Sequence, residues 1–384
     1  MPVIARSSAL KSCASLADVE KLAKQRLAVA VRDFISAGAD GQWTLERNSS
    51  QFKKYLLRQK IPDDAFEINL KCRFTMKNRD FSYEMPIGMA PIPLHGLVHA
   101  KAEEPMVKVA SSLKIPAIAS LLSNLSYQEI SEIERPNESW MQVYIPEDMD
   151  HTLKGIELIQ TVGYKALVIS VGCPIDGRRR SDERNQFGLP SHLKYGNFRY
   201  FRRVSPNETF QDSQSEKIRI NTSLTFDWKQ LETIVKHSDI PVILKGILRG
   251  DEAEKAVQVG CSAVYVSNHG GRQLDYAPAT IECLPEIFKA VNNRIPIFLD
   301  GGIRSGCDVV KAISLGADLV FIGRPYIYGL SLGGQPGITQ VFDILRQELM
   351  GAMRMAGYHD ADSIKHDSKH NQVVHESYYR NIKL

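Results

Sequence analysis

The stretch that decides the fold is Ala263-Val264-Tyr265-Val266-Ser267-Asn268-His269-Gly270-Gly271-Arg272, where four apolar residues lead directly into a polar turn. A continuous apolar run of this length is typical of a strand buried on both faces. The glycine pair lets the backbone turn sharply and lets a flat ligand approach closely. His269 can take a proton near neutral pH, and the Arg272 guanidinium matches the shape of a carboxylate. The stretch therefore predicts a buried strand that delivers a base and an anion-binding group to one site, rather than a polar surface loop.

Similar apolar runs recur from about residue 85 onward, and helical patterns separate them. The other runs are Pro86–Met89, Pro116–Ala119, Trp140–Tyr144, Leu167–Val171, Val242–Lys245, Ile297–Asp300 and Leu319–Ile322. The helical patterns lie near 99–112, 126–134, 150–162, 226–238, 251–259, 280–292, 305–315 and 338–356. Strands that alternate with helices form a parallel sheet covered by helices. Eight such units over roughly 250 residues predict an α/β fold of the (β/α)8 TIM barrel type. An open doubly wound sheet is disfavoured because no GxGxxG motif follows the first strand.

The whole chain, 1–384, is expected to form a single domain with three additions to the barrel. The barrel itself covers 85–358. The additions are an N-terminal helical segment at 1–84, a loop insertion after strand 4 at 180–224 and a C-terminal tail at 359–384. Within the N-terminal segment, helical stretches are expected at 18–37 and 42–50. We expect the N-terminal segment to close the base of the barrel. The insertion has no clear strand or helix pattern, and a long loop at this position suits a lid over the site. A solvated loop without function is the alternative.

The composition is that of a globular protein, with 43% hydrophobic and 24% charged residues in 384. A net charge of +4 is too small to predict a nucleic-acid partner. The six cysteines form no CxxC pair, which favours reduced thiols in an intracellular protein over disulfides or a metal site. No apolar run approaches the roughly 20 residues that span a membrane. The C-terminal Ile382-Lys383-Leu384 resembles a peroxisomal tripeptide with isoleucine in place of serine, so a cytoplasmic or a peroxisomal location is expected.

Polar side chains gather at the carboxyl ends of the expected strands, which is where TIM barrels carry their chemistry. These residues are Ser120, Gln142, Tyr144, Ser170, Lys245, the stretch from Ser267 to Arg272, and the turns Asp300 to Arg304 and Gly323-Arg324. Such an asymmetry between the two ends of the strands predicts an enzyme.

The last two turns place glycines and arginines after strands seven and eight, where barrels bind phosphate. Gly302 and Gly323 leave backbone N–H groups accessible to a ligand, and Arg304 and Arg324 add positive charge. We therefore expect a phosphate site rather than two tight turns with exposed arginines.

Lys245 at the end of strand five has two chemically distinct uses. It could form a Schiff base, as in barrel aldolases, or hold negative charge on a cofactor ring. A phosphate site together with the amide and hydroxyl groups of Gln142, Ser120 and Ser170 favours the cofactor.

From about residue 18 to 360 the chain resembles the FMN-dependent α-hydroxy acid oxidase and dehydrogenase family, which includes glycolate and lactate oxidases. The most specific piece is Ser267 to Asp275, supported by Pro296 to Arg304, Phe321 to Pro325, Ser36 to Asp40 and Gln42 to Thr44. The resemblance implies an FMN cofactor bound by Pro91, Ser120, Gln142, Ser170, Lys245, Ser267, Asp300, Gly302, Arg304, Gly323 and Arg324. It also implies that His269 is the catalytic base and that Tyr144, Arg179 and Arg272 bind the substrate.

Three positions depart from the family pattern, and all of them are on the substrate side. Phe34 replaces a tyrosine that contacts the substrate carboxylate, and Leu122 replaces a tryptophan over the pocket. Gly172 stands where an aspartate pairs with the catalytic histidine, and Asp176 is the nearest carboxylate that could take its place. Such a carboxylate orients the imidazole and stabilises its charged form. We therefore expect a larger, more apolar pocket and a weaker base than a glycolate oxidase has.

The leading hypothesis is an FMN-dependent oxidoreductase that oxidises a carboxylate-bearing substrate at its α-carbon, a 2-hydroxy acid by family default. The three departures also fit C–N dehydrogenation of a cyclic amino or imino acid in secondary metabolism. A flavin-binding protein without turnover is the alternative of another class. The electron acceptor is O2 or a molecule that the sequence does not identify. The family resemblance implies a homo-oligomer, namely a tetramer.

Overall fold

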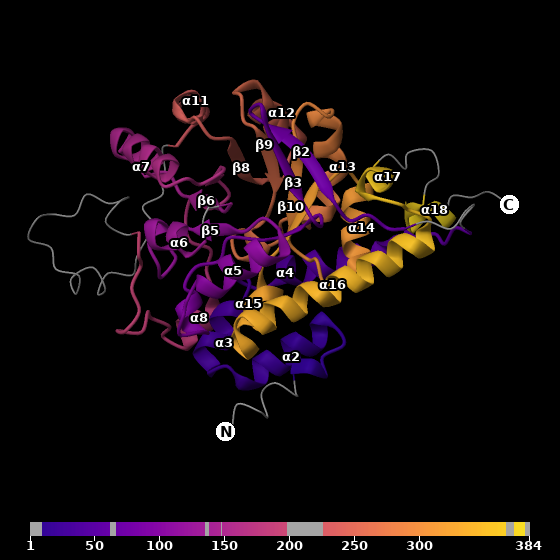
Figure 1. The fold of residues 1–384 in the computed structure, drawn as a ribbon, viewed down its shortest axis with the longest axis horizontal. Coiled ribbons are helices and arrows are strands. Elements are labelled where there is room, and N and C mark those ends of the chain that lie inside the picture. The colour runs from indigo at the N-terminus through magenta and orange to yellow at the C-terminus, as the bar shows by residue number, and fades with distance from the viewer. Residues whose placement is uncertain are drawn as a thin grey trace, which may run out of the picture.

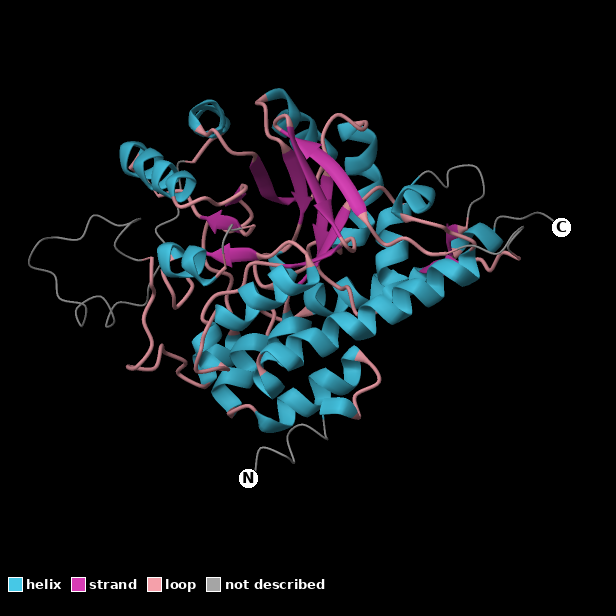
Figure 2. Ribbon diagram, in the orientation of Figure 1, coloured by secondary structure: helices cyan, strands magenta, loops and turns pink. Residues whose placement is uncertain are grey.

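Eight parallel strands form the central sheet of the computed structural model, which describes residues 10–61, 67–134, 138–146, 148–197, 226–365 and 372–380 (Figures 1 and 2). In chain order the strands are β4 (Ile87–Met89), β5 (Ile118–Ser120), β6 (Trp140–Val143), β7 (Leu167–Ser170), β8 (Val242–Ile247), β9 (Ala263–Val266), β10 (Ile297–Asp300) and β11 (Leu319–Ile322). From β5 to β11 each strand pairs with the next, β11 returns to pair with β4, and an isolated parallel bridge from Met89 to Ala117 closes the ring between β4 and β5. The predicted TIM barrel is therefore confirmed.

Helices surround the barrel and follow the strands in the predicted order (Figure 2). They are α5 (Glu104–Leu113), α6 (Tyr127–Ile133), α7 (Met149–Thr161), α11 (Trp228–His237), α12 (Gly250–Gln258), α13 (Thr280–Val291), α14 (Gly306–Ser314) and α16 (Gln335–Ala356). Local sequence fixes several of their starts. Ser126 and Glu129 form a reciprocal capping box on α6, and Asp227 and Gln230 do the same on α11.

Two helical predictions were wrong in detail. The expected stretch 18–37 is two helices, α2 (Leu16–Arg26) and α3 (Val29–Ser36), because Leu27 takes an extended conformation between them. Helix α15 (Arg324–Gly333) was not predicted at all. Its side chains are buried around most of its circumference, so its sequence lacks the alternation of polar and apolar residues that marks a surface helix.

The N-terminal segment closes the base of the barrel only in part. The hairpin of β2 (Cys72–Met76) and β3 (Arg79–Tyr83) lies beside β9 and β10 in Figure 1 and packs on the aromatic side chains that fill the barrel. Phe74 contacts Phe298, and Phe81 contacts Trp140 edge-on. The helices before the hairpin lie at the opposite, carboxyl end of the strands. They include α4 (Trp43–Ser50), which confirms the predicted stretch 42–50.

The remaining short elements lie outside the barrel strands. They are the 3-10 turns η1 (Gln51–Lys54), η2 (His95–Leu97) and η3 (His269–Gly271), the paired strands β1 (Tyr55–Leu57) and β12 (Val373–His375), and the helices α8 (Arg180–Arg184), α17 (Ala361–Lys365) and α18 (Ser377–Arg380). Helix α8 contradicts the prediction that the insertion contains no helix. The rest of the insertion from 198 onward and the C-terminal tripeptide lie outside the described residues. None of the described helices is long and apolar enough to cross a membrane.

Candidate active site

A cavity of about 1320 Å³ opens at the carboxyl ends of the barrel strands. It exceeds the roughly 300–1,000 Å³ of an ordinary ligand pocket, so it has room for a cofactor and a substrate together. With one exception, every predicted site residue lines this cavity. The lining residues are Pro91, Ser120, Gln142, Tyr144, Ser170, Arg179, Lys245, His269, Arg272, Asp300, Gly302, Arg304, Gly323 and Arg324. Ser267 is the exception: it is buried directly behind the lining.

The loop after β9 holds His269 in an uncommon backbone conformation. His269, Gly270 and Gly271 have successive φ values of 56°, 65° and 73°, and the left-handed region is unfavourable for a residue with a Cβ. A side chain at Gly271 would meet the backbone of Leu45 at 2.7 Å, so glycine is required there. Paired amides fix the loop, since Asn268 and Asn48 exchange hydrogen bonds of 2.9 and 2.7 Å. The N-terminal helix α4 therefore shapes the loop that carries the histidine.

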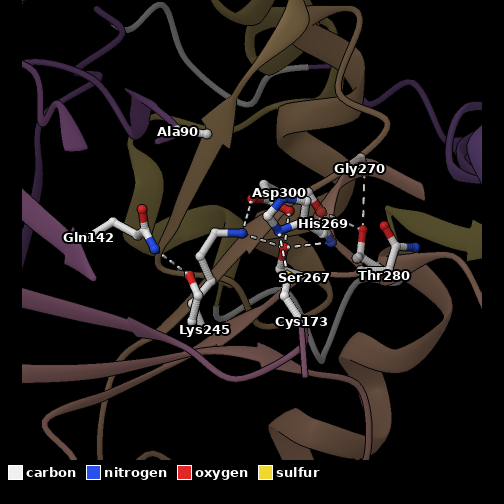
Figure 3. A network of polar contacts seen from close by, with 12 residues as sticks. Ala90, Gln142, Cys173, Lys245, Ser267, His269, Gly270, Thr280 and Asp300 are labelled. Atoms are coloured by element: carbon white, nitrogen blue, oxygen red, sulfur yellow. Dashed lines mark hydrogen bonds and ion pairs between the residues drawn. The ribbon is translucent and has the colours of Figure 1, made fainter. Parts of the chain in front are cut away.

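The His269 imidazole contacts the thiol of Cys173, with 3.1 Å between Nδ1 and Sγ (Figure 3). Burial lowers the pKa of His269 well below its usual range, and the nearby cations Lys245, Arg272 and Arg179 lower it further. The ring is therefore neutral near pH 7, as a general base must be. Asp176, the carboxylate that the sequence left open as a replacement, lines the cavity but makes no hydrogen bond or ion pair with His269 in the described part of the chain.

Arg272 is held firmly at one edge of its guanidinium group. Its Nη1 donates to the backbone carbonyls of Phe34 (2.7 Å) and Ala37 (3.0 Å), and the Phe34 ring lies beneath it at 5.2 Å. Its Nε and Nη2 have no hydrogen-bond partner among the described residues, so they are free to bind a carboxylate. Burial and, to a smaller extent, the nearby Arg179 and Arg324 lower the pKa of Arg272 to about 9, which marks a site short of negative charge.

Arg179 lies at the start of α8 and pairs with Asp182, with 3.1 Å between Nε and Oδ2. Arg179 is close enough to Arg272 for its positive charge to lower the pKa of Arg272. Tyr144 lines the same part of the cavity, and burial raises the pKa of its hydroxyl well above the usual value, so it stays protonated. Together these groups place two guanidinium groups and a hydroxyl in the cavity that His269 lines.

Two chains of hydrogen bonds connect the polar residues at the strand ends. Ser120 Oγ donates to Gln142 Oε1 at 3.2 Å, and Gln142 Nε2 donates to Ser170 Oγ at 3.1 Å. Lys245 Nζ lies 2.9 Å from Asp300 Oδ2 and donates to Ser267 Oγ at 2.6 Å (Figure 3). Amide, hydroxyl and ammonium groups at neighbouring strand ends are the donor set that the edge of a flavin ring and a ribityl chain require.

The turns after β10 and β11 have the geometry that an anion cradle requires. Gly301 and Gly302 have φ values of 92° and 95°, and Thr280 Oγ1 donates to the carbonyls of Asp300 (2.6 Å) and Gly301 (3.1 Å). Helix α15 begins at Arg324 with Gly323 as its cap, and a helix start after the eighth strand is the usual phosphate site of a TIM barrel. The residues present therefore fit an FMN phosphate.

The positive charge of the Arg324 side chain is not directed at this cradle alone. Its three nitrogens donate to the carbonyls of Ile35, Gly270 and Ala37, each at 3.0 Å. The physical reason is burial: a guanidinium group removed from water needs carbonyl partners, and the end of α3 and the histidine loop supply them. The predicted phosphate contact of Arg324 stays a prediction, because its side chain is bound to these carbonyls.

Each of the three departures has a structural counterpart. Phe34 stacks on Phe187 of the insertion at 4.3 Å between ring centroids and carries the Arg272 guanidinium on its face. Leu122 lines the cavity. At Gly172 an added Cβ would lie 3.2 Å from the Cα of Gly246, so the backbone of β8 approaches closely where the family has its aspartate.

Sequence reasoning missed three groups that shape this site: Cys173, Asp182 and the Asn48–Asn268 pair. The partners in the first and last of these contacts are 96 and 220 residues apart, so no local motif signals them.

A family model described as FMN-dependent dehydrogenase matches residues 23–371. An L-lactate oxidase of Nostoc sp. is 37% identical over 357 residues, covering 91% of this chain and 96% of the relative. A glycolate oxidase 3 of Oryza sativa subsp. indica is 33% identical, covering 89% and 92%. A solved structure of mandelate oxidase with (S)-2-phenylpropionate superposes with a TM-score of 0.82 at 30% identity, covering 94% and 98%.

Fold, site and relatives thus define a flavin-dependent oxidoreductase built on a TIM barrel. The chain belongs to the FMN-dependent dehydrogenase family, and its cofactor is FMN.

Proposed function

We propose that the protein oxidises the α-carbon of a 2-hydroxy acid that carries a bulky, apolar side chain. The observation that carries this proposal is the pairing of His269 and Arg272 on one loop, facing a cavity whose remaining walls are largely apolar. A neutral imidazole beside two arginines suits a substrate that brings its own negative charge and gives up a proton.

In this proposal each side chain has a separate task. The free edge of Arg272 and the guanidinium of Arg179 bind the substrate carboxylate, and the hydroxyl of Tyr144 donates a further hydrogen bond. His269 takes the substrate proton on its imidazole. When bound, FMN would supply the acceptor for the two electrons and the second hydrogen that the substrate loses as its C=O bond forms, and Lys245 would place its positive charge beside the ring.

The preference for apolar bulk rests on the walls of the cavity. Leu122, Ile175, Phe187 and Leu189 line it together with Phe34, and two of these, Phe187 and Leu189, come from the insertion after β7. Burying an apolar side chain there is favourable by about 25 cal/mol per Å² of surface removed from water. Glycolate has no such surface to bury, whereas an aromatic or branched 2-hydroxy acid has.

A cyclic amino or imino acid that loses hydrogen across its C–N bond is the second candidate. It is favoured by the neutral partner of His269, because Cys173 cannot stabilise an imidazolium as a carboxylate does. An amine with a suitable pKa requires a weaker base than an alcohol does.

Two other readings are disfavoured by specific contacts. A Schiff-base aldolase needs a free lysine amine, and Lys245 is committed to Asp300 and Ser267. A flavin-binding protein without turnover has no use for a histidine held in a strained conformation beside two arginines.

The test is anaerobic stopped-flow reduction of the bound flavin by a panel of acids. The panel contains glycolate, L-lactate, branched and aromatic 2-hydroxy acids, and cyclic imino acids. We expect reduction to become faster and binding to become tighter with apolar size among the hydroxy acids. Faster reduction by glycolate than by every larger acid would refute the proposed preference, and reduction by the imino acids alone would select the second candidate.

We further propose that the protein works inside the cell as a homo-oligomer, a tetramer by resemblance, with O2 as the acceptor. Its six cysteines, all free, favour a reducing compartment. Oxygen consumption during turnover and light scattering of the holoprotein test the acceptor and the oligomeric state.

A further inference from the structure

The contact between Cys173 and His269 connects the loop after β7 with the loop after β9. Nδ1 and Sγ are 3.1 Å apart, within the range of a hydrogen bond to sulfur, and only 7% of Cys173 is exposed. Figure 3 shows the two side chains together among the polar residues of the site. The Nε2 atom of His269 has no hydrogen-bond partner among the described residues. The contact therefore occupies one ring nitrogen and leaves the other for a ligand.

The neighbouring glycine explains why the partner is Cys173 and not residue 172. Gly172 has no side chain, and its Cβ position is restricted by the Gly246 backbone at 3.2 Å. Gly246 in turn has a φ of 116°, and a Cβ there would lie 2.5 Å from the nitrogen of Gly172. The strand ends of β7 and β8 are thus packed backbone to backbone. The first side chain beyond them that reaches the imidazole is Cys173.

We propose that Cys173 is the positioning residue for His269, and that its thiol fixes the imidazole through Nδ1 so that Nε2 is available to the substrate. This inference rests on the proposed function of His269 as the base. It assigns to a neutral thiol the place that a carboxylate has in the family pattern.

A thiol differs from a carboxylate in two physical respects. It can donate or accept a weak hydrogen bond, so it is compatible with either neutral tautomer of the ring. It also carries no charge here, because burial raises the pKa of Cys173 to about 12. The ring is therefore oriented but receives no counter-charge when it takes a proton.

The two carboxylates near the pair do not contact the ring in the described part of the chain: Asp300 is paired with Lys245, and Asp176 makes no hydrogen bond or ion pair with His269. Lys245 of β8, Arg272 of the same loop, Arg179 before α8 and Arg324 of α15 are all cationic and disfavour the imidazolium. His269 consequently stays neutral until the substrate carboxylate enters.

The contact itself can be tested without any substrate by infrared spectroscopy of the holoprotein. The S–H stretching band lies where other protein groups do not absorb, and Cys173→Ser identifies the contribution of this thiol. We expect that band to shift in His269→Ala and to be unchanged in Cys283→Ala, a matched control because Cys283 is 6% exposed and does not line the cavity. An unchanged Cys173 band in His269→Ala would overturn the pair.

The positioning role is tested by flavin reduction across pH in three variants. Cys173→Ala should bind FMN normally and reduce roughly three- to tenfold more slowly, as expected for one lost hydrogen bond. Cys173→Ser should recover most of the rate, because a hydroxyl also donates and accepts. Cys173→Asp should shift the ascending limb of the pH profile upward by about one unit or more, since a carboxylate stabilises the imidazolium.

The two proposals fail in different ways. A wild-type flavin that is reduced, with rate and pH limb unchanged in Cys173→Ala, refutes the positioning role and leaves the proposed function intact. A wild-type flavin that no acid reduces, with the S–H band still shifted in His269→Ala, supports the contact and overturns the proposed function.

Discussion

At the scale of single residues, the site keeps its base in a conformation that costs free energy. A left-handed histidine costs of the order of 1–3 kcal/mol, and the loop persists because Asn48, Asn268 and Arg324 hold its backbone. The type of residue and its place after a buried strand were enough to place His269, Arg272 and Lys245 in one cavity. Cys173 could not be predicted in this way, because its contact with His269 joins residues 96 apart, and Asp182 was missed because helix α8, which brings it to Arg179, was not predicted.

His269→Asn should abolish flavin reduction without unfolding the loop. Asparagine tolerates the left-handed conformation, so stability and FMN content are expected to stay near wild type. Loss of a positioned base typically lowers the rate by about two to four orders of magnitude. Single-turnover reduction by the best acid of the panel measures the effect, and a wild-type rate would show that another group takes the proton.

Arg272→Lys should weaken substrate binding more than it slows the chemistry. A lysine cannot keep two contacts to the carbonyls of Phe34 and Ala37 and also present a planar edge to a carboxylate. Hydrogen bonds to a charged group contribute about 1.5–3 kcal/mol, so the dissociation constant should rise roughly 10- to 150-fold. Arg249→Lys, at an exposed position paired with Asp251, is the control. Equal affinities in both variants would contradict the assigned clamp.

At the scale of secondary structure, prediction succeeded wherever burial had a simple pattern. Every barrel strand is a short apolar run buried on both faces, and each was found. Helix α15 was missed because it is buried on nearly all sides, and α2 and α3 were merged because Leu27 and Ala28 carry no obvious breaker. The hairpin β2–β3 was missed as well, since its role in covering the barrel base depends on tertiary contacts with Trp140 and Phe298.

Gly302→Ala should damage both the fold and the cofactor site. The added Cβ would lie 2.1 Å from the carbonyl oxygen of Asn48, at a φ of 95°. Overpacking alone costs about 1–3 kcal/mol, and the displaced turn no longer presents its N–H groups to phosphate. Thermal unfolding and FMN titration provide the readouts. In Gly351→Ala nothing lies within 4 Å of the new Cβ on helix α16, so this control should match or exceed wild-type stability. Full FMN binding by Gly302→Ala would argue against the cradle.

At the scale of the whole molecule, buried histidines make the fold sensitive to acid. Burial lowers the pKa of His95 to about 3, and its Nε2 contacts the Tyr326 hydroxyl at 3.2 Å beneath the site. In the unfolded chain the pKa of histidine is near 6.5, so His95 binds a proton there at a pH at which it stays neutral in the folded chain. Stability should therefore fall as pH drops below about 6.5, with the loss from this group continuing until the folded pKa is reached.

His95→Gln should make that decline shallower, because glutamine keeps a hydrogen-bonding group but does not titrate. The comparison is needed because burial raises the pKa of the neighbouring Glu103, which acts in the opposite direction. Unfolding free energies between pH 5 and 7.5 measure the slope, with the exposed His375→Gln as control. Equal slopes in all three proteins would show that His95 is not the group responsible.

The proposed function requires the barrel mouth to join FMN to a base and an arginine clamp for an apolar carboxylic acid. It is tested most directly by mixing the holoprotein anaerobically with an aromatic 2-hydroxy acid and following the flavin absorbance. We predict complete bleaching in the wild type, faster than with glycolate, and none on that time scale in His269→Asn. An unbleached wild-type flavin with every acid of the panel, or equal bleaching in the His269 variant, would contradict the account.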